Sequence, residues 1–97
     1  MKRLVFTPAA RDDLLAIGLF IAEDNPQRAE SFVAELEVKA ALICKQPLSF
    51  PERADISPGV RAAVHGRYLL FFRVLDNDVR IVRILHGARN FRQVFET

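Results

Sequence analysis

A chain of 97 residues, 51% of them hydrophobic and 27% charged, is long enough for one domain with a single core, because a chain of this size buries about two-thirds of its unfolded surface. Its only cysteine, Cys44, excludes an internal disulfide and gives no sign of an oxidising compartment. No run approaches the roughly 18 apolar residues of a membrane span, and the first residues lack a signal-peptide core, so we expect a cytoplasmic protein.

The formal net charge of +2 is unevenly distributed. Residues 1–59 carry seven Lys or Arg against nine Asp or Glu, which gives −2. Residues 60–97 carry seven Arg against three acidic residues, which gives +4. Arginine binds carboxylates and phosphates through two parallel hydrogen bonds. The C-terminal segment is therefore expected to face an acidic polypeptide, a nucleic acid, or both.

The first residues predict a short strand over 2–6 and then a helix over 8–23. Thr7 suits the N-cap of this helix, and Pro8 suits its first position, where a missing N–H costs nothing. Apolar residues at helical spacing form one stripe that should face the core. The stripe consists of Ala10, Leu14, Ile17, Gly18 and Ile21.

The same helix carries a second apolar set outside that stripe. At about 100° per residue, Leu15, Leu19 and Ala22 lie to one side of the first stripe and Phe20 lies to the other. One interpretation is a helix buried on two sides, between a sheet and a second helix. The other interpretation is a groove that accepts an amphipathic helix from a partner.

A second helix is predicted over residues 26–45, with Asp24 or Asn25 as its N-cap. Two helices joined by so short a connection must pack as an antiparallel hairpin. The apolar stripe of the second helix consists of Ala29, Phe32, Val33, Leu36, Ala40 and Ile43. Residues 46–59 hold three prolines and predict a loop that Leu48, Phe50 and Ile56 anchor to the core.

Three apolar runs then predict an antiparallel meander, with strands over 60–65, 67–75 and 79–86. The middle strand is apolar on both faces. One face must pack on the helix hairpin, and we expect no further element of the chain to cover the other. That second face is therefore expected to dock another chain. The tail over 87–97 is either a last turn of helix or an extended arm.

No metal site and no cofactor are expected, because the two histidines and one cysteine lack ligand spacing and the four glycines are scattered. His65, His86 and Tyr68, together with the arginines, could form an acid–base site for RNA cleavage without a metal. His65 and His86 end neighbouring strands, so both could reach one end of the sheet. The alternative for each histidine is a structural hydrogen bond, which is the commoner role.

The order of these elements resembles the ParE branch of the RelE/ParE toxin superfamily over nearly the whole chain. The supporting stretches are residues 10–17, Pro26 with Ala29 and Phe32, the Gly-x-Arg at 59–61, and residues 82–90, which contain a His-x-x-Arg. The resemblance agrees with a single α+β domain over residues 1–97. Its expected architecture is an N-terminal strand and an α-helical hairpin packed on an antiparallel sheet with a C-terminal three-strand meander.

The resemblance implies the toxin of a type II toxin–antitoxin system, which arrests growth by inhibiting DNA gyrase and acts by binding rather than by hydrolysis. Its partner would be a ParD-like antitoxin, a ribbon-helix-helix protein whose C-terminal arm wraps the toxin in a hetero-oligomer. DNA would be contacted only through the antitoxin. The residues expected to contact the antitoxin are the apolar anchors Leu15 and Leu19 and the basic residues Arg61, Arg73, Arg80, Arg83, His86 and Arg89.

Two alternatives remain open. The first is a ribosome-dependent mRNA endoribonuclease of the RelE type, with Arg61, Arg83 and His86 as catalytic residues. Against it, the lysines that this branch carries before its middle strands are absent, and Phe91 stands where the family uses a tyrosine. The second alternative is an α+β interaction module without toxicity, whose arginines form a solvated face.

Overall fold

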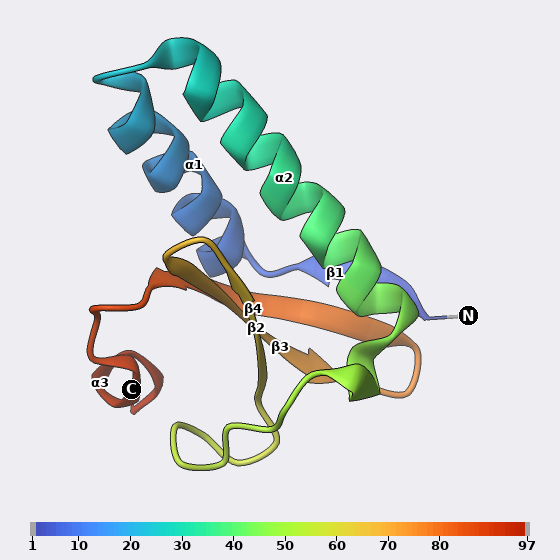
Figure 1. Cartoon of the computed structure of the whole chain (residues 1–97). Helices are drawn as coiled ribbons and strands as arrows, with labels where there is room; N and C mark the ends of the chain where they lie inside the picture. The colour runs from blue at the N-terminus through green and yellow to red at the C-terminus, as the bar shows by residue number, and fades with distance from the viewer. Residues whose placement is uncertain (1, 97) are drawn as a thin grey trace.

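The computed structural model describes residues 2–96 and confirms the predicted α+β fold (Figure 1). The helix and strand boundaries agree with the sequence predictions to within about two residues. The elements are β1 (Arg3–Phe6), α1 (Pro8–Ala22), α2 (Pro26–Lys45), a 3-10 turn (Pro47–Ser49), β2 (Arg61–His65), β3 (Tyr68–Val74), β4 (Asp78–His86) and α3 (Phe91–Phe95).

The four strands form one sheet in the order β1-β4-β3-β2. The meander of β2, β3 and β4 is antiparallel, as predicted. β1 pairs parallel to β4, with Arg3 opposite Asp78 and Phe6 opposite Ile81, so the sheet is mixed rather than wholly antiparallel. This pairing places the start of α1 directly beside β4.

Both long helices begin at side-chain caps. Thr7 Oγ1 accepts a hydrogen bond from the Ala10 N–H at 3.1 Å and donates one to the Val82 carbonyl at 2.9 Å. Asn25 rather than Asp24 caps α2, because its side-chain oxygen accepts from the Arg28 N–H at 3.1 Å. The Thr7 hydroxyl thus both caps α1 and ties it to β4.

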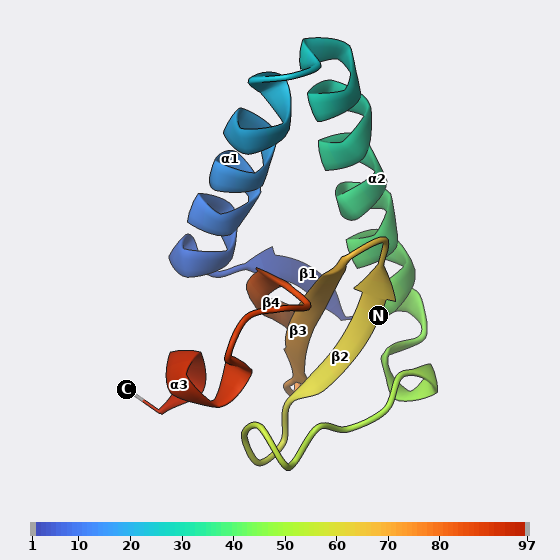
Figure 2. The ribbon, with the colours of Figure 1, turned by 60° about the vertical axis from the view of Figure 1, so that its left-hand side comes forward.

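The α1–α2 hairpin covers one face of the sheet, called here the helix face (Figures 1 and 2). Tyr68, Leu70 and Phe72 alternate along β3 and point toward the hairpin. The predicted stripe of α1 is only partly buried, because Leu14 and Ile21 keep some exposure. The fully buried core on this face includes Ala10, Leu36, Ala40, Ile43, Leu70, Phe72, Val79 and Ile81.

The opposite face of the sheet, called here the far face, is covered by the chain itself. The expectation that no element would cover this face is wrong. Phe71 is fully buried there, and its ring lies 4.9 Å from the Phe91 ring and 5.3 Å from the Phe95 ring of α3. Ile56 of the preceding loop packs against the same cluster. The tail therefore seals the surface that we expected to dock another chain.

The loop between α2 and β2 follows the end of the sheet and pairs with it. Ala62 N–H donates to the Pro51 carbonyl at 3.2 Å, and Arg53 N–H donates to the Val60 carbonyl at 2.7 Å. Phe50 is a core anchor, as predicted, and its ring meets Phe72 edge-on at 6.0 Å. The prediction is wrong for Leu48, which is 71% exposed because it lies in the 3-10 turn at the end of α2.

A bulge in β4 directs one arginine onto α1. Phe71 lies opposite Arg83 while Phe72 lies opposite Ile81, so Val82 is an extra residue in β4. Arg83 Nε and Nη2 donate to the two carboxylate oxygens of Asp13 at 2.8 and 2.9 Å. The Ile84 N–H also donates to Asp13, at 2.8 Å. One carboxylate therefore joins α1 to the bulge through three hydrogen bonds.

Replacing Phe91 with Ala should lower the free energy of unfolding by about 2 kcal/mol, because the half-buried ring covers Phe71 and its loss leaves apolar surface in water. Urea unfolding followed by circular dichroism measures this change. Leu48→Ala is the control, because the exposed Leu48 side chain should cost less than about 0.5 kcal/mol. Equal losses in the two variants would mean that α3 does not seal the far face.

Replacing Asp13 with Asn should cost about 2–3 kcal/mol, because Arg83, whose side chain is 25% exposed, would lose its partner in a half-buried position. Asp12→Asn removes the same charge from the neighbouring exposed position and should change stability by less than about 0.5 kcal/mol. Chemical denaturation of both variants under one buffer condition gives the comparison. A similar small effect in both would contradict the anchoring role of Asp13.

Candidate partner-binding site

The residues predicted to contact a partner lie in five separate places. Leu15 and Leu19 are on the side of α1 next to α2, and Arg61 and Arg73 lie beside the loop that precedes β2. Arg80 is near the start of β4, and Arg83 is at its bulge. His86 and Arg89 lie together at the end of β4.

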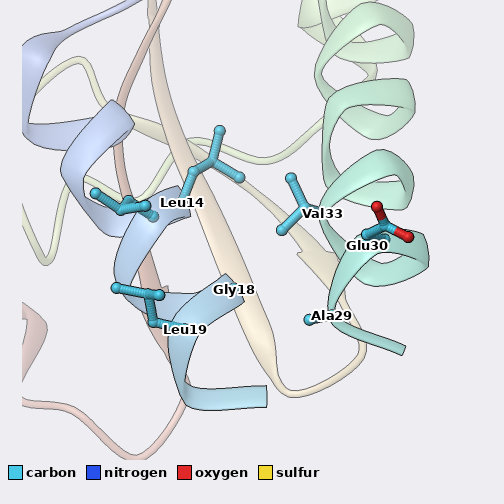
Figure 3. A pocket seen from close by; sticks show the side chains of 7 residues that line it. Leu14, Gly18, Leu19, Ala29, Glu30 and Val33 are labelled. Atoms are coloured by element: carbon cyan, nitrogen blue, oxygen red, sulfur yellow. The ribbon is translucent and has the colours of Figure 1, made fainter. Parts of the chain in front are cut away.

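The apolar residues border an open groove between α1 and α2 (Figure 3). Leu15 is 64% exposed and Leu19 is 62% exposed, although both are large apolar side chains. Of the two interpretations of the second stripe, burial on both sides is therefore wrong. The hollow measures about 490 Å³ and is lined by Leu14, Leu15, Gly18, Leu19, Ala29, Glu30 and Val33.

A glycine shapes the floor of this groove. A Cβ at Gly18 would lie 3.3 Å from Cγ2 of Val33, a side chain that points from α2 toward α1 in Figure 3. The absence of a side chain at Gly18 lets the two helices approach at this level. Glu30 is the only charged residue in the lining, so the groove fits an apolar occupant better than a charged one.

Arg61 and Arg73 hold the loop before β2. Arg61 Nη1 donates to the Phe50 carbonyl at 2.7 Å. Arg73 Nη1 donates to the Pro58 carbonyl at 2.7 Å, and its Nη2 donates to the Ser57 hydroxyl at 3.0 Å. Both guanidinium groups thus fasten a segment of irregular backbone to the sheet.

Arg80 lies opposite Arg73 in the β3–β4 register, on the far face of the sheet. Its Nη2 donates to Asp78 at 2.7 Å, and Asp78 is only 6% exposed. Arg3 approaches the same carboxylate at 3.7 Å. Arg80 is therefore paired at the opposite end of β4 from His86.

Arg83 is also compensated inside the protein. Its guanidinium spans both oxygens of Asp13, and this hydrogen-bonded partner raises the pKa of Arg83 further above its ordinary value. The ion pair is half-buried, so it is less screened than a pair on the open surface. The sequence gives no sign of this pair, because Asp13 and Arg83 are 70 residues apart along the chain.

The two histidines lie at one end of the sheet, which confirms that part of the prediction. Tyr68 is opposite His65 on one side and opposite His86 on the other. The Tyr68 and His86 rings meet edge-on at 5.2 Å, and the Tyr68 and Phe32 rings are 5.6 Å apart. A row of aromatic side chains therefore runs along this end of the helix face.

His65 has a structural partner on α2. Its Nε2 lies 2.8 Å from Glu35, and the Glu35 carboxylate also accepts from Arg28 Nη1 at 2.6 Å. Hydrogen bonds from Arg28 and, second, from His65 lower the pKa of Glu35 below its ordinary value. The carboxylate thus ties the end of β2 to α2 whenever it is ionised.

The structure does not gather the three residues of the nuclease alternative. Arg61 begins β2 and His65 ends it, so Arg61 lies about 13 Å along the strand from the level of His86. Arg83 has its charge balanced by Asp13. His86 keeps a free ring nitrogen, because its Nδ1 accepts from the Ala88 N–H at 3.1 Å and its Nε2 has no hydrogen-bond partner within residues 2–96.

Residues 2–96 contain no group of three His, Cys, Asp or Glu side chains placed to hold a metal ion. In the same part of the chain, no helix combines the length and the hydrophobicity that crossing a membrane requires.

Comparison with known proteins identifies relatives over almost the whole length. The family described as ParE toxin of type II toxin–antitoxin system, parDE, matches residues 4–91. Toxin RelE2 of Caulobacter vibrioides is 31% identical over 91 residues, which is 92% of this chain and 99% of that protein. A solved structure of the chromosomal ParDE toxin–antitoxin system from P. aeruginosa has a TM-score of 0.76 and 25% identity, covering 89% of this chain and 96% of that chain.

The matched region runs from β1 to the start of α3 and so includes the helix hairpin, the open groove between its helices and all of the sheet except Arg3. The resemblance inferred from the order of elements and from short motifs is confirmed at the level of the family. This chain belongs to the ParE toxin family of type II toxin–antitoxin systems.

Proposed function

We propose that this protein arrests growth by binding and inhibiting DNA gyrase, and that a ParD-like antitoxin neutralises it in a hetero-oligomer. The observation that carries the antitoxin part is the open apolar groove beside Leu15 and Leu19. The family and the solved ParDE relative support a partner of this type.

The groove suits the apolar side of an amphipathic arm. Leu15 and Leu19 are four residues apart and so present adjacent side chains along α1. An arm that fills the space between them and Val33 would bury both leucines and remove apolar surface from water. An arm that is disordered when free pays its ordering cost on binding, and the burial of these side chains offsets that cost.

The basic residues predicted to contact the antitoxin differ in how many of their N–H groups are free to bind an acidic arm. Arg61, Arg73, Arg80 and Arg83 already donate to partners inside the protein, so they would contact the antitoxin only through their remaining N–H groups. His86 and Arg89 are exposed at the end of β4. These two are the stronger candidates for contact with acidic groups.

Inhibition by binding is favoured over RNA cleavage because the nuclease residues are dispersed and partly neutralised. The RelE-type endoribonuclease remains the second candidate function. It is supported by the relative named RelE2 and by the contact between Tyr68 and His86. In that alternative a single histidine and a tyrosine would have to supply the acid and the base.

Purified protein, freed from its antitoxin, should inhibit supercoiling by purified gyrase at micromolar concentration or trap cleaved DNA complexes. Addition of excess antitoxin is the control and should restore full supercoiling. Unimpaired supercoiling, together with new codon-linked 5′ ends on translated messages after expression, would replace gyrase inhibition with the nuclease alternative.

Replacing Leu15 and Leu19 together with Ala should weaken antitoxin binding about 150-fold, since losing the burial of two leucine side chains costs roughly 3 kcal/mol. Both positions are exposed, so the toxin should fold and arrest growth as before. Val38→Ala is the control, because this 70% exposed side chain lies on α2 outside the groove. Calorimetric affinities that match in the double variant and the control would exclude the groove as the antitoxin site.

A further inference from the structure

A second hollow lies on the flank of α1 that faces away from α2. It has a volume of about 200 Å³ and lies between α1 and the ends of β3 and β4. Ala16, Ile17 and Phe20 form the α1 side, and Ala16 and Phe20 lie about 100° around the helix from Leu15 and Leu19. Figure 1 shows the end of β4 passing beneath α1, and Ile84, Leu85 and His86 of this strand line the hollow. We call it the sheet-end pocket.

Three hydrogen-bond donors at the sheet-end pocket have no acceptor within residues 2–96. The Tyr68 hydroxyl and the Arg89 guanidinium make no hydrogen bond there, and Arg89 is exposed. His86 Nδ1 accepts from the Ala88 N–H, so the proton of the neutral ring is on Nε2. The rim of the pocket therefore offers donors on three side chains from two strands and a turn.

Asp13, the one acidic residue in the lining, does not offer an acceptor to these free donors. Asp13 accepts from Arg83 Nε and Nη2 and from the Ile84 N–H, so both of its oxygens are already engaged. The Asp13–Arg83 pair is neutral as a unit. The charge of Arg89 is therefore left uncompensated, and the pocket fits a ligand that carries a negative charge.

The pocket also has an apolar wall, so its ligand should carry an apolar group beside the negative charge. Phe20 is 67% exposed, which is unusual for an aromatic ring beside a fully formed core. Together with Ala16 and Leu85 it forms an apolar surface next to the donors. An apolar side chain placed on Phe20 would remove much of this ring from water.

A polypeptide supplies both groups better than a nucleic acid does. The volume of about 200 Å³ holds one or two side chains but is small for a nucleotide. Each strand of a nucleic-acid duplex carries one charge about every 3.4 Å, so a strand needs several cations in a row. Arg89 is the one arginine or lysine in the lining of the pocket, and the net charge of the chain is only +2.

We propose that the sheet-end pocket is a second polypeptide-binding site, which takes a carboxylate carried next to an apolar side chain. The carboxylate accepts from Arg89, from His86 Nε2–H and from the Tyr68 hydroxyl, and the apolar side chain packs on Phe20. This site lies across α1 from the proposed antitoxin groove. The site uses His86 and Arg89, the two basic residues that the proposed function leaves open to an acidic partner, and it rests on that part of the proposed function but not on gyrase being the target.

Titration of the ¹⁵N-labelled full-length protein with the capped tripeptide acetyl-Glu-Leu-Glu-amide, followed by NMR, tests this site. We expect saturable millimolar binding, with shift changes at Phe20, Tyr68, His86 and Arg89. The matched peptide acetyl-Gln-Leu-Gln-amide should bind about tenfold more weakly, because it lacks the charge-assisted hydrogen bonds. The Arg89→Gln variant should bind the acidic peptide about tenfold more weakly as well.

Arg11→Gln is the control variant, because Arg11 is an exposed arginine of α1 that lies over the Phe6 ring and does not line the pocket. It should bind the acidic peptide as the unmodified protein does. Equal affinity for the two peptides, or shifts confined to the groove around Leu15 and Leu19, would overturn the proposal. Tighter binding of a short oligouridylate at the same residues would assign the pocket to nucleic acid and would equally overturn it.

Discussion

The three hydrogen bonds to Asp13 determine where α1 lies on the sheet. Arg83 reaches this carboxylate only because the bulge at Val82 shifts the alternation of β4 by one residue. The contact holds α1 over β4. The two flanks of α1 then border different surfaces. One flank forms the groove with α2, and the other overhangs the sheet-end pocket.

Most of the positive charge of the C-terminal segment is used inside the protein. Arg61 and Arg73 hold the irregular loop, Arg80 compensates the buried Asp78, and Arg83 compensates Asp13. The far face, which looked available from the sequence, is closed by that loop and by α3. The exposed apolar surface of this ParE-family toxin is therefore concentrated on the helix hairpin, at residues such as Leu15, Leu19 and Phe20.

The fold could be predicted because its determinants are local: Thr7-Pro8 begins one helix, Asn25 caps the next, and three apolar runs form a meander. The cover of the far face was missed because it depends on Phe91 and Phe95 meeting Phe71 across the sheet, and a five-residue helix has almost no local signal. The sequence set Leu15 and Leu19 apart as a second apolar stripe but left open whether that stripe is buried or accepts a partner. It could not indicate which arginines stay free, because the partner of each is distant along the chain.

The proposed binding of the antitoxin along the helix hairpin, with the far face left sealed, can be tested by hydrogen–deuterium exchange of the toxin alone and in complex with its antitoxin. We expect slower exchange in the complex over α1 and α2 around the groove and unchanged exchange over α3 and residues 51–60. Protection of α3 by the antitoxin, or faster exchange there on binding, with α1 unaffected, would contradict it.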